Sequence, residues 1–103
     1  MKNLDNQSWR AGYEENADAQ ILDVRTPDEF EEGYIPNAKL LNVQDPMNFT
    51  EGIEKLDKDK EYYVYCRSGK RSQMACQVME NMGFKAVNNL ATGIIEWDGN
   101  IEK

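Results

Sequence analysis

The segment "YYVYCRSGKRSQMACQVMENMGF", residues 62–84, decides the fold of this chain. It begins with an aromatic and β-branched run that is typical of a strand. A loop containing Gly69 follows, and apolar residues then recur at helical spacing up to Gly83, a residue type that commonly follows a helix C-terminus. The segment therefore predicts a strand over 60–66, a short loop and a helix over 71–82.

The same alternation of strand and helix extends outward in both directions. Further strands are expected over 19–25, 38–43 and 85–90, and further helices over 26–33, 48–56 and 93–99, with one helical turn around 8–15. The apolar runs are continuous rather than alternating, which favours an α/β fold with a mainly parallel sheet. Because no repeat, linker or low-complexity stretch interrupts this pattern, we expect a single domain over residues 1–103.

Local signals place two of the helix starts. Thr26 is suited to cap a helix, and Pro27 fits the first helical position, so a short helix that stops at Gly33 is expected. Thr50 is a candidate cap for the weaker helix over 48–56.

Composition and charge exclude several classes of protein. The 103 residues carry a net charge of −7, which disfavours a nucleic-acid partner because phosphate binding needs a basic face. No apolar run approaches the roughly 18 residues of a membrane span. The N-terminal residues lack the apolar region of a secretory signal, so a cytoplasmic location is expected.

The chain contains two cysteines, Cys66 and Cys76, and no histidine. This absence excludes the usual Ser-His-Asp and Cys-His forms of catalysis. It also leaves too few soft ligands for a zinc site, so neither a metal nor a cofactor is expected. A reactive cysteine in this chain needs an activating group other than imidazole.

Cys66 stands where an α/β sheet places its ligands, at the carboxyl end of a strand. The loop after it contains Arg67, Lys70 and Arg71, and its backbone N–H groups are expected to form an anion-binding nest at the start of the next helix. Cations and a helix N-terminus can lower a cysteine pKa to roughly 3.5–7.5. The alternative, a small buried apolar residue, fits poorly with the cationic and hydroxylic residues that follow.

Three segments stand in order along the chain: "LDVRTPDEFEEGYIPNA" (22–38), "CRSGKRS" (66–72) and "GIIEW" (93–97). Together they resemble the rhodanese (thiosulfate sulfurtransferase) family. "CRSGKRS" (66–72) closely matches the active-site loop of these domains, and "LDVRTPDEFEEGYIPNA" (22–38) resembles their other signature. "GIIEW" (93–97) resembles the glycine-rich turn that leads to a tryptophan. The length suits the single-domain members of the family.

The resemblance implies a five-stranded, mainly parallel sheet flanked by helices, and a sulfur-transfer reaction. Cys66 would attack the outer sulfur of a donor such as thiosulfate and carry a persulfide, which a thiol, cyanide or a protein acceptor then takes. The loop residues would hold the persulfide anion, and two of them, Lys70 and Arg71, would attract thiosulfate. The substrate-binding set is Arg67, Ser68, Gly69, Lys70, Arg71 and Ser72.

Other functions remain as alternatives. A sulfur-relay or binding module would receive persulfide sulfur from a partner protein, with little turnover of free thiosulfate. Cysteine phosphatases place five residues between Cys and Arg, whereas only four separate Cys66 from Arg71, which disfavours that activity. An inactive interaction domain is disfavoured because the cysteine and the cationic loop are intact. The physiological donor and acceptor, the pathway and the oligomeric state stay open.

The chain departs from the family pattern at three positions. Tyr34 replaces a common histidine, Asn37 replaces a glycine, and Thr92 replaces the first glycine of the late turn. Asparagine tolerates positive φ, so the turn at Asn37 can still form. The shape near Trp97 is the feature that Thr92 puts in question.

Two further residues near the motifs have competing interpretations. Arg25 is expected to pair with Asp28 or Glu29, the alternative being that it borders the site together with Asp23. Cys76 is expected to be a packing residue inside the helix, the alternative being a resolving thiol for Cys66.

Overall fold

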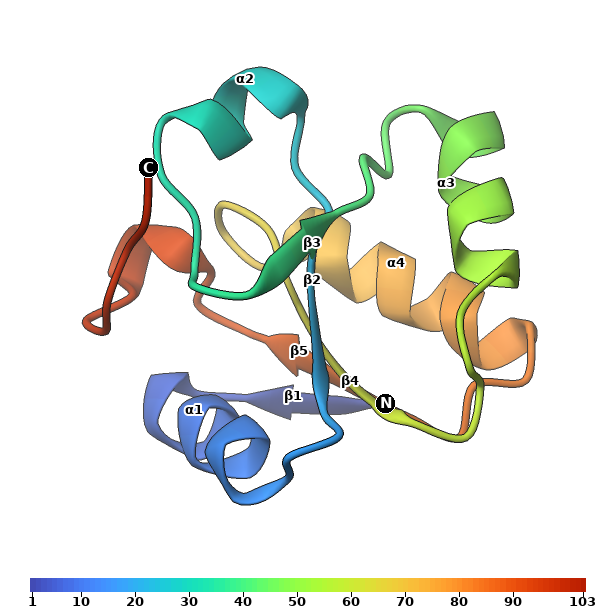
Figure 1. Ribbon diagram of the computed structural model, residues 1–103, viewed down its shortest axis with the longest axis horizontal. Coiled ribbons are helices and arrows are strands. Elements are labelled where there is room, and N and C mark those ends of the chain that lie inside the picture. The colour runs from blue at the N-terminus through green and yellow to red at the C-terminus, as the bar shows by residue number, and fades with distance from the viewer.

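A computed structural model describes all residues from 1 to 103. It contains five strands, four α-helices and one 3-10 helix, which Figure 1 shows along the chain. The elements are β1 (Lys2–Leu4), α1 (Asn6–Glu15), β2 (Gln20–Asp23), α2 (Pro27–Glu31), β3 (Ala38–Leu40), α3 (Pro46–Glu54), β4 (Glu61–Tyr65), α4 (Lys70–Asn81), β5 (Ala86–Leu90) and η1 (Ile94–Glu96).

The five strands form one sheet in the order β1-β5-β4-β2-β3, and every neighbouring pair is parallel. This confirms the predicted α/β class and the five-stranded sheet. Asp23 and Tyr65 are register partners at the carboxyl ends of β2 and β4. Cys66, one residue after Tyr65, therefore lies at the edge of the sheet where ligands bind in this class of fold.

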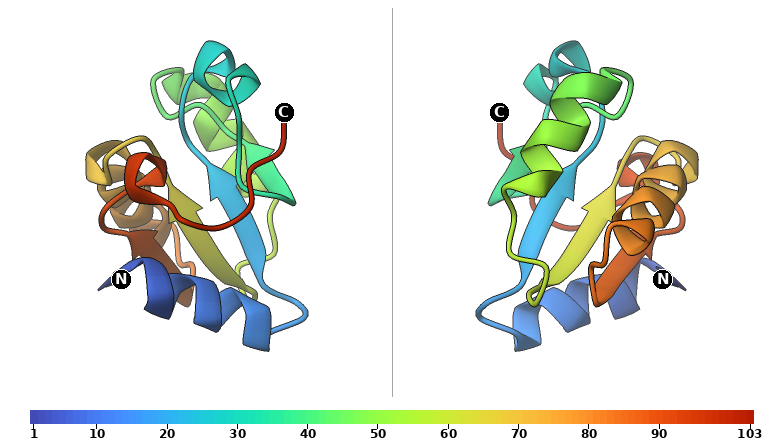
Figure 2. Two further views of the ribbon diagram at one scale, coloured as in Figure 1. Left: turned by 90° about the vertical axis from the view of Figure 1, so that its left-hand side faces the viewer. Right: turned by 90° about the vertical axis from the view of Figure 1, so that its right-hand side faces the viewer.

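Helices cover both faces of the sheet. Figure 2 shows α1 on one side and α3 with α4 on the other. Successive residues of β4 point to opposite faces, so Tyr62 and Val64 join the apolar cluster under α3 and α4, whereas Tyr63 and Tyr65 join the cluster around Trp9 of α1. Burial on both faces explains why β4 is a continuous apolar run.

Helix α2 starts as predicted. The Thr26 hydroxyl accepts a hydrogen bond from the Glu29 N–H, and the Glu29 carboxylate accepts one from the Thr26 N–H. This capping box satisfies two backbone donors at the helix start. It also fixes Glu29, whose carboxylate projects from α2 toward the Cys66 loop.

Some of the predicted elements are wrong in detail. Helix α3 begins at Pro46 after Asp45, so Thr50 lies inside the helix and does not cap it. The single turn expected around 8–15 is the full helix α1, whose start is capped by the Asp5 carboxylate accepting from the Ser8 N–H at 2.8 Å. The last helix, expected over 93–99, is the short η1.

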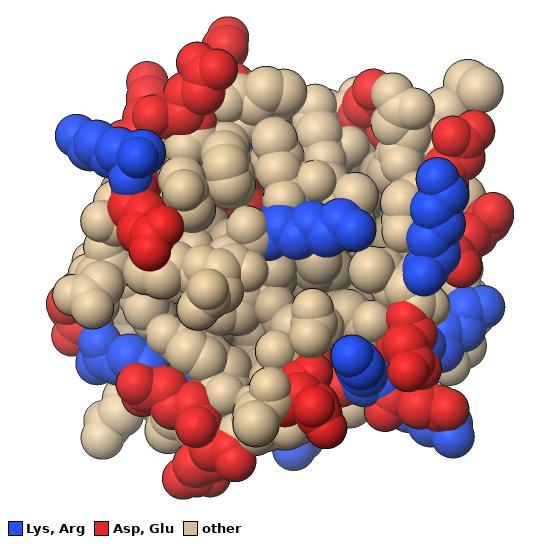
Figure 3. All heavy atoms as spheres, in the orientation of Figure 1, with Lys and Arg blue, Asp and Glu red and all other residues tan.

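Acidic and basic side chains are interspersed on the face that Figure 3 shows. Most of them lie around its rim, one basic side chain lies near its centre, and no single acidic patch dominates this face. No helix of the structure combines the length and the apolar character that crossing a membrane requires.

Candidate active site

The loop after β4 is shaped by two glycines. Gly69 has φ +96°, and a Cβ at this position would lie 2.2 Å from the Ala91 carbonyl oxygen. A Cβ on Gly93 would lie 2.1 Å from the Arg67 carbonyl oxygen. The loop after β4 and the segment after β5 that contains Ala91 and Gly93 therefore pack backbone against backbone, which only glycine permits at positions 69 and 93.

Backbone hydrogen bonds lock the two loops together. The Ile94 N–H donates to the Cys66 carbonyl at 3.0 Å, and the Ile95 N–H donates to the Arg67 carbonyl at 3.1 Å. The segment that matches the late family motif thus holds the start of the cysteine loop. These two hydrogen bonds fix the path of the backbone at Cys66 and Arg67, where the chain passes from β4 into the loop.

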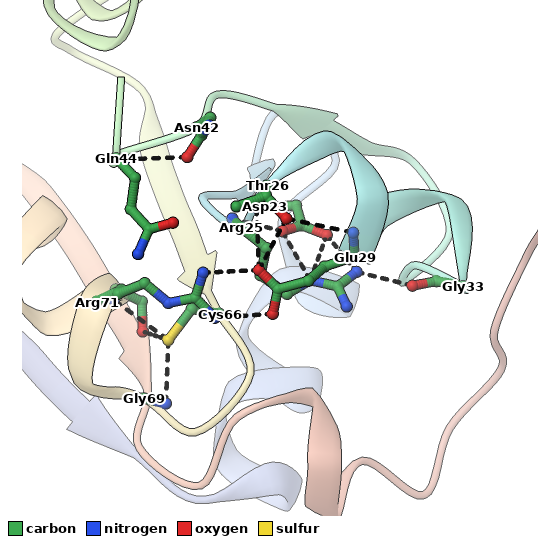
Figure 4. Close-up of polar contacts among 11 residues, drawn as sticks. Asp23, Arg25, Thr26, Glu29, Gly33, Asn42, Gln44, Cys66, Gly69 and Arg71 are labelled. Carbon is green, nitrogen blue, oxygen red and sulfur yellow. Dashed lines mark hydrogen bonds and ion pairs between the residues drawn. The ribbon is translucent and has the colours of Figure 1, made fainter. Parts of the chain in front are cut away.

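Three donor groups of its own loop lie within hydrogen-bond distance of the Cys66 sulfur. The Gly69 N–H lies 3.1 Å from Sγ, the Ser72 N–H 3.3 Å and the Ser72 hydroxyl 3.4 Å (Figure 4 shows the Gly69 bond). Gly69 is the residue before the first turn of α4, so both N–H groups belong to the unsatisfied donors of a helix start. The arrangement is the expected nest, aimed at sulfur.

These donors determine the ionisation of the thiol. Burial by itself raises the pKa of Cys66, because a charge is less stable away from water. The hydroxyl and N–H of Ser72, with the N–H groups of Ser68 and Gly69, outweigh the burial and lower the pKa of Cys66 below its ordinary value. Hydrogen bonds to the charged form, rather than the neighbouring cations, are the main activators.

The three cations of the loop occupy different environments. Arg67 and Lys70 are exposed. The Arg71 guanidinium instead makes a two-pronged ion pair with Glu29 of α2, with N–O distances of 2.7 and 2.8 Å. Figure 4 shows the two side chains pointing toward each other beside Cys66.

Glu29 is a site residue that the sequence did not single out. The hydrogen bonds from Arg71 lower the pKa of Glu29 to about 2, so the pair stays charged at neutral pH. Arg71 therefore has a partner before any anion arrives. An anion that enters the site must share Arg71 with Glu29 or draw it away.

The expectation that Arg25 pairs with Asp28 or Glu29 is wrong. Glu29 is taken by Arg71, and the Arg25 guanidinium instead binds the Asp23 carboxylate, at 2.7 Å in its shortest contact, and the Gly33 carbonyl. The Tyr65 hydroxyl also donates to Asp23 at 2.7 Å. Arg25 and Asp23 are 5% and 0% exposed, so this network is a buried brace between β2, β4 and the turn after α2.

A hollow of about 380 Å³ lies beside the loop. Its lining comes from the end of β2, α2, the cysteine loop and η1, namely Arg25, Glu29, Glu32, Arg67, Ile94 and Ile95. Arg25 thus lines this hollow, whereas Asp23, which the second interpretation placed beside it, is fully buried and does not line it. No group of three or more His, Cys, Asp or Glu side chains in the structure is placed to hold a metal ion.

Cys76 lies on α4 in the same apolar cluster as Cys66, and both cysteines are free. Burial raises the pKa of Cys76 to about 12, so it stays a neutral thiol. These properties are those of a packing residue.

The structure describes the surroundings of the three residues that depart from the pattern, Tyr34, Asn37 and Thr92. Asn37 adopts φ +72°, as expected for a residue in place of glycine. The ring of Tyr34 stacks on Phe30 at 4.1 Å between centroids. The Thr92 hydroxyl is buried without a hydrogen-bond partner, while Trp97 packs edge-on against Trp9 as part of the second apolar cluster.

Asn89 on β5 is a second residue beside the candidate site that the sequence analysis did not identify. Its amide bonds to the Ser72 hydroxyl and to the Gly69 carbonyl, both in the cysteine loop. The available signal was the pair of asparagines, Asn88 and Asn89, in a strand expected to be buried. A buried polar side chain needs a partner, and here the partner is the candidate site.

The family model of the rhodanese-like domain matches residues 6–100. A protein of Bacillus subtilis named "Putative sulfurtransferase YtwF" is 36% identical over 99 residues, covering 96% of this chain and 92% of that protein. The thiosulfate sulfurtransferase GlpE of Coxiella burnetii is 39% identical over 80 residues, covering 78% of this chain and 72% of that protein. The chain therefore belongs to the rhodanese family.

Two further comparisons bear on the fold and the range of roles. A rhodanese-like domain protein from Staphylococcus aureus superposes with a TM-score of 0.84 at 31% identity, covering 99% of this chain and 97% of that one. A protein of Bacillus subtilis named "Putative sulfur carrier protein YrkF" is 33% identical over 97 residues, covering 93% of this chain but 50% of that protein. The relatives of this chain thus include proteins named for sulfur transfer and for sulfur carriage.

Proposed function

We propose that this protein is a sulfurtransferase that moves sulfane sulfur from a donor such as thiosulfate to a thiol or cyanide acceptor, through a persulfide on Cys66. One observation carries the proposal. The Cys66 sulfur accepts hydrogen bonds from Gly69 and Ser72 of its own loop, in a chain without histidine. The names of the relatives support the same reaction class.

The first half-reaction uses the nest. The Cys66 thiolate attacks the outer sulfur of thiosulfate, a new S–S bond forms, and the original S–S bond breaks with its electron pair leaving on sulfite. The loop from Arg67 to Ser72 then holds the anionic outer sulfur of the persulfide, as nests of N–H groups hold anions. Lys70 and Arg71 would stabilise the departing sulfite by their charge.

The second half-reaction restores the enzyme. An acceptor thiolate or cyanide attacks the outer sulfur of the persulfide, and the electron pair of that S–S bond returns to Cys66 as a thiolate. Because Cys66 is 1% exposed, donor and acceptor reach the sulfur only when the groups that cover it move aside.

Turnover of thiosulfate and cyanide into thiocyanate and sulfite tests this function. Wild type is expected to turn over many times, Cys66→Ser to lose all activity above background, and Cys76→Ser to keep nearly all of it. A Cys66→Ser variant with wild-type turnover would overturn the assignment of the nucleophile. A large loss in Cys76→Ser would favour the resolving-thiol role.

The relay function is the second candidate, and the relative named as a sulfur carrier favours it. A relay protein takes up one sulfur per Cys66 from a persulfide donor but shows little repeated turnover with free thiosulfate and cyanide. Single-turnover loading measured beside steady-state rates separates the two: stoichiometric loading without turnover indicates the relay. The absence of loading from any sulfane donor contradicts both functions.

A further inference from the structure

Asn89 lies on β5 behind the cysteine loop and is 1% exposed. Its side-chain nitrogen is 3.1 Å from the Gly69 carbonyl oxygen and 2.9 Å from the Asn3 side-chain oxygen of β1. Its side-chain oxygen faces the Ser72 hydroxyl. One buried amide thus touches the loop at both residues whose groups hold the Cys66 sulfur.

The partners fix the orientation of this amide. The Gly69 carbonyl can only accept a hydrogen bond, so the Asn89 atom facing it must be the nitrogen. The atom facing Ser72 is then the Asn89 oxygen, which can also only accept. The hydrogen bond between Ser72 and Asn89 therefore uses the hydroxyl hydrogen of Ser72.

Ser72 has one hydroxyl hydrogen and two acceptors within reach. The Ser72 oxygen is 2.5 Å from the Asn89 oxygen and 3.4 Å from the Cys66 sulfur. When Cys66 is a thiol, its S–H can donate to Ser72 while Ser72 donates to Asn89, and all three groups are satisfied. When Cys66 is a thiolate, the sulfur needs the hydrogen that Asn89 also attracts.

We infer that Asn89 is a positioning residue that controls the reactivity of Cys66 by competing with the sulfur for the hydroxyl hydrogen of Ser72. Asn89 favours the thiol through this competition. Through its bond to the Gly69 carbonyl it holds the loop in the shape that stabilises the thiolate. The two contacts therefore act on the same sulfur in opposite directions.

A consequence follows for sulfur transfer, and this consequence alone rests on the proposed function. In the persulfide the inner sulfur of Cys66 has two covalent bonds and no charge, so it is a weak acceptor. The Ser72 hydrogen can then return to Asn89 while the N–H groups turn to the outer sulfur. Asn89 thus provides an alternative acceptor for Ser72 in the loaded state.

The chain offers a matched control in the neighbouring residue. Asn88 is on the same strand and 3% exposed, but its side-chain nitrogen donates to the Tyr62 carbonyl, and it makes no hydrogen bond to the cysteine loop. Asn88→Ala removes a buried amide of the same kind without touching Ser72 or Gly69. It reports the cost of losing such an amide as such.

The experiment measures the rate at which iodoacetamide alkylates Cys66 as a function of pH, with the modified peptide identified by mass. Cys76 does not interfere at neutral pH, because burial raises its pKa to about 12 and its peptide is distinguished from that of Cys66 by mass. The charged groups of the surrounding elements are the same in every variant: Asp23, Arg25, Glu29, Arg67, Lys70 and Arg71. This readout needs no sulfur donor, so it can fail or succeed independently of the proposed function.

Four proteins form a double-mutant cycle: wild type, Asn89→Ala, Ser72→Ala and the double variant. Ser72→Ala is expected to move the midpoint of the pH–rate curve to higher pH. Asn89→Ala should shift the midpoint further toward low pH in the protein with Ser72 than in the Ser72→Ala protein. This coupling corresponds to roughly a two- to tenfold difference in rate below the midpoint. Asn88→Ala should match wild type.

Two results would overturn the inference. One is an equal effect of Asn89→Ala with and without Ser72, which would show that Asn89 acts only through Gly69. The other comes from Asn89→Asp, which also serves if the alanine variant does not fold. Its carboxylate holds the Ser72 hydrogen more strongly and opposes a nearby thiolate, so the midpoint should move to higher pH. A move to lower pH, or none, would contradict the competition.

Discussion

The two cysteines of this protein are buried to the same extent, but their pKa values are shifted in opposite directions. Cys66 and Cys76 are 1% and 0% exposed and belong to the same apolar cluster. Yet the pKa of Cys66 is below its ordinary value, and that of Cys76 is raised to about 12. Burial penalises both thiolates, and only Cys66 has the N–H and hydroxyl donors that offset it. The loop, not the exposure of the thiol, makes a nucleophile.

Among the predicted substitutions, replacement of Gly69 should remove the activating environment of Cys66 most completely. In Gly69→Ala the new Cβ would meet the Ala91 carbonyl at 2.2 Å, at a φ of +96° that alanine rarely adopts. We expect a loss of about 3 kcal/mol or more of stability and a loss of sulfur transfer of at least ~100-fold. Denaturant unfolding and thiocyanate formation measure these two effects.

Gly83→Ala is the matched control for that substitution. Gly83 has nearly the same φ, +97°, but the nearest atom to a new Cβ is Cδ of the flexible Lys58 side chain at 3.9 Å. The backbone strain alone should cost about 1 kcal/mol and leave activity intact. Equal effects on activity at the two glycines would show that strain, rather than the shape of the nest, explains the loss.

The contributions of the two cysteines to the free energy of unfolding should change with pH in opposite directions. The neutral buried Cys76 contributes stability that is fully present below the unfolded pKa of about 8.5 and is lost as pH rises toward the folded pKa of about 12. The stability difference between wild type and Cys76→Ala should therefore fall by roughly 1.4 kcal/mol per pH unit above about pH 8.5.

Cys66 should behave in the opposite way. Its folded pKa is lowered, so its thiolate contributes stability that is present above the unfolded pKa and is lost as pH falls through the folded pKa. The difference between wild type and Cys66→Ala should grow as pH rises toward about 8.5 and stay level above it, whereas that of Cys76→Ala is level below about 8.5 and shrinks above it. Urea unfolding across pH measures both, and parallel curves would contradict the opposed ionisation.

The cations should have smaller effects than the hydrogen bonds. Arg71→Ala leaves the Glu29 carboxylate without its partner beside the site, so KM for thiosulfate should rise about tenfold. Lys70→Ala, which removes an exposed charge, should raise it only about two- to threefold. Steady-state kinetics at varied thiosulfate measure both.

A second substitution sharpens that test. If the unpaired Glu29 carboxylate causes much of the Arg71→Ala effect, adding Glu29→Gln should lower KM again. If KM is unchanged by Arg71→Ala, or the second substitution brings no recovery, the charge pairing between α2 and the loop has no role in binding the donor.

The sequence predicted the parts of this structure that depend on local pattern. The aromatic run before Cys66, the capping residue Thr26 and the αL position of Gly83 each follow from their own few residues, and each is confirmed. The parallel sheet followed from the continuous apolar runs. β1 was missed because Lys2–Leu4 is short and polar, and only its pairing with β5 makes it a strand.

The missed site residues share a physical reason. Glu29 meets Arg71 across 42 positions of the chain, and Asn89 meets Ser72 across 17. No local pattern specifies which acidic residue reaches a given arginine, and Arg25 showed this when its partner proved to be Asp23. The loop motif located Cys66, but the tertiary fold selected the groups that tune it.

Peptide-resolved mass spectrometry after exposure to thiosulfate tests the central claim most directly. The account predicts that the peptide containing Cys66 gains the mass of one sulfur atom, that the peptide containing Cys76 gains nothing, and that cyanide removes the added sulfur as thiocyanate. Sulfur on Cys76, or an unmodified Cys66 after exposure to thiosulfate and to persulfide donors, would contradict it.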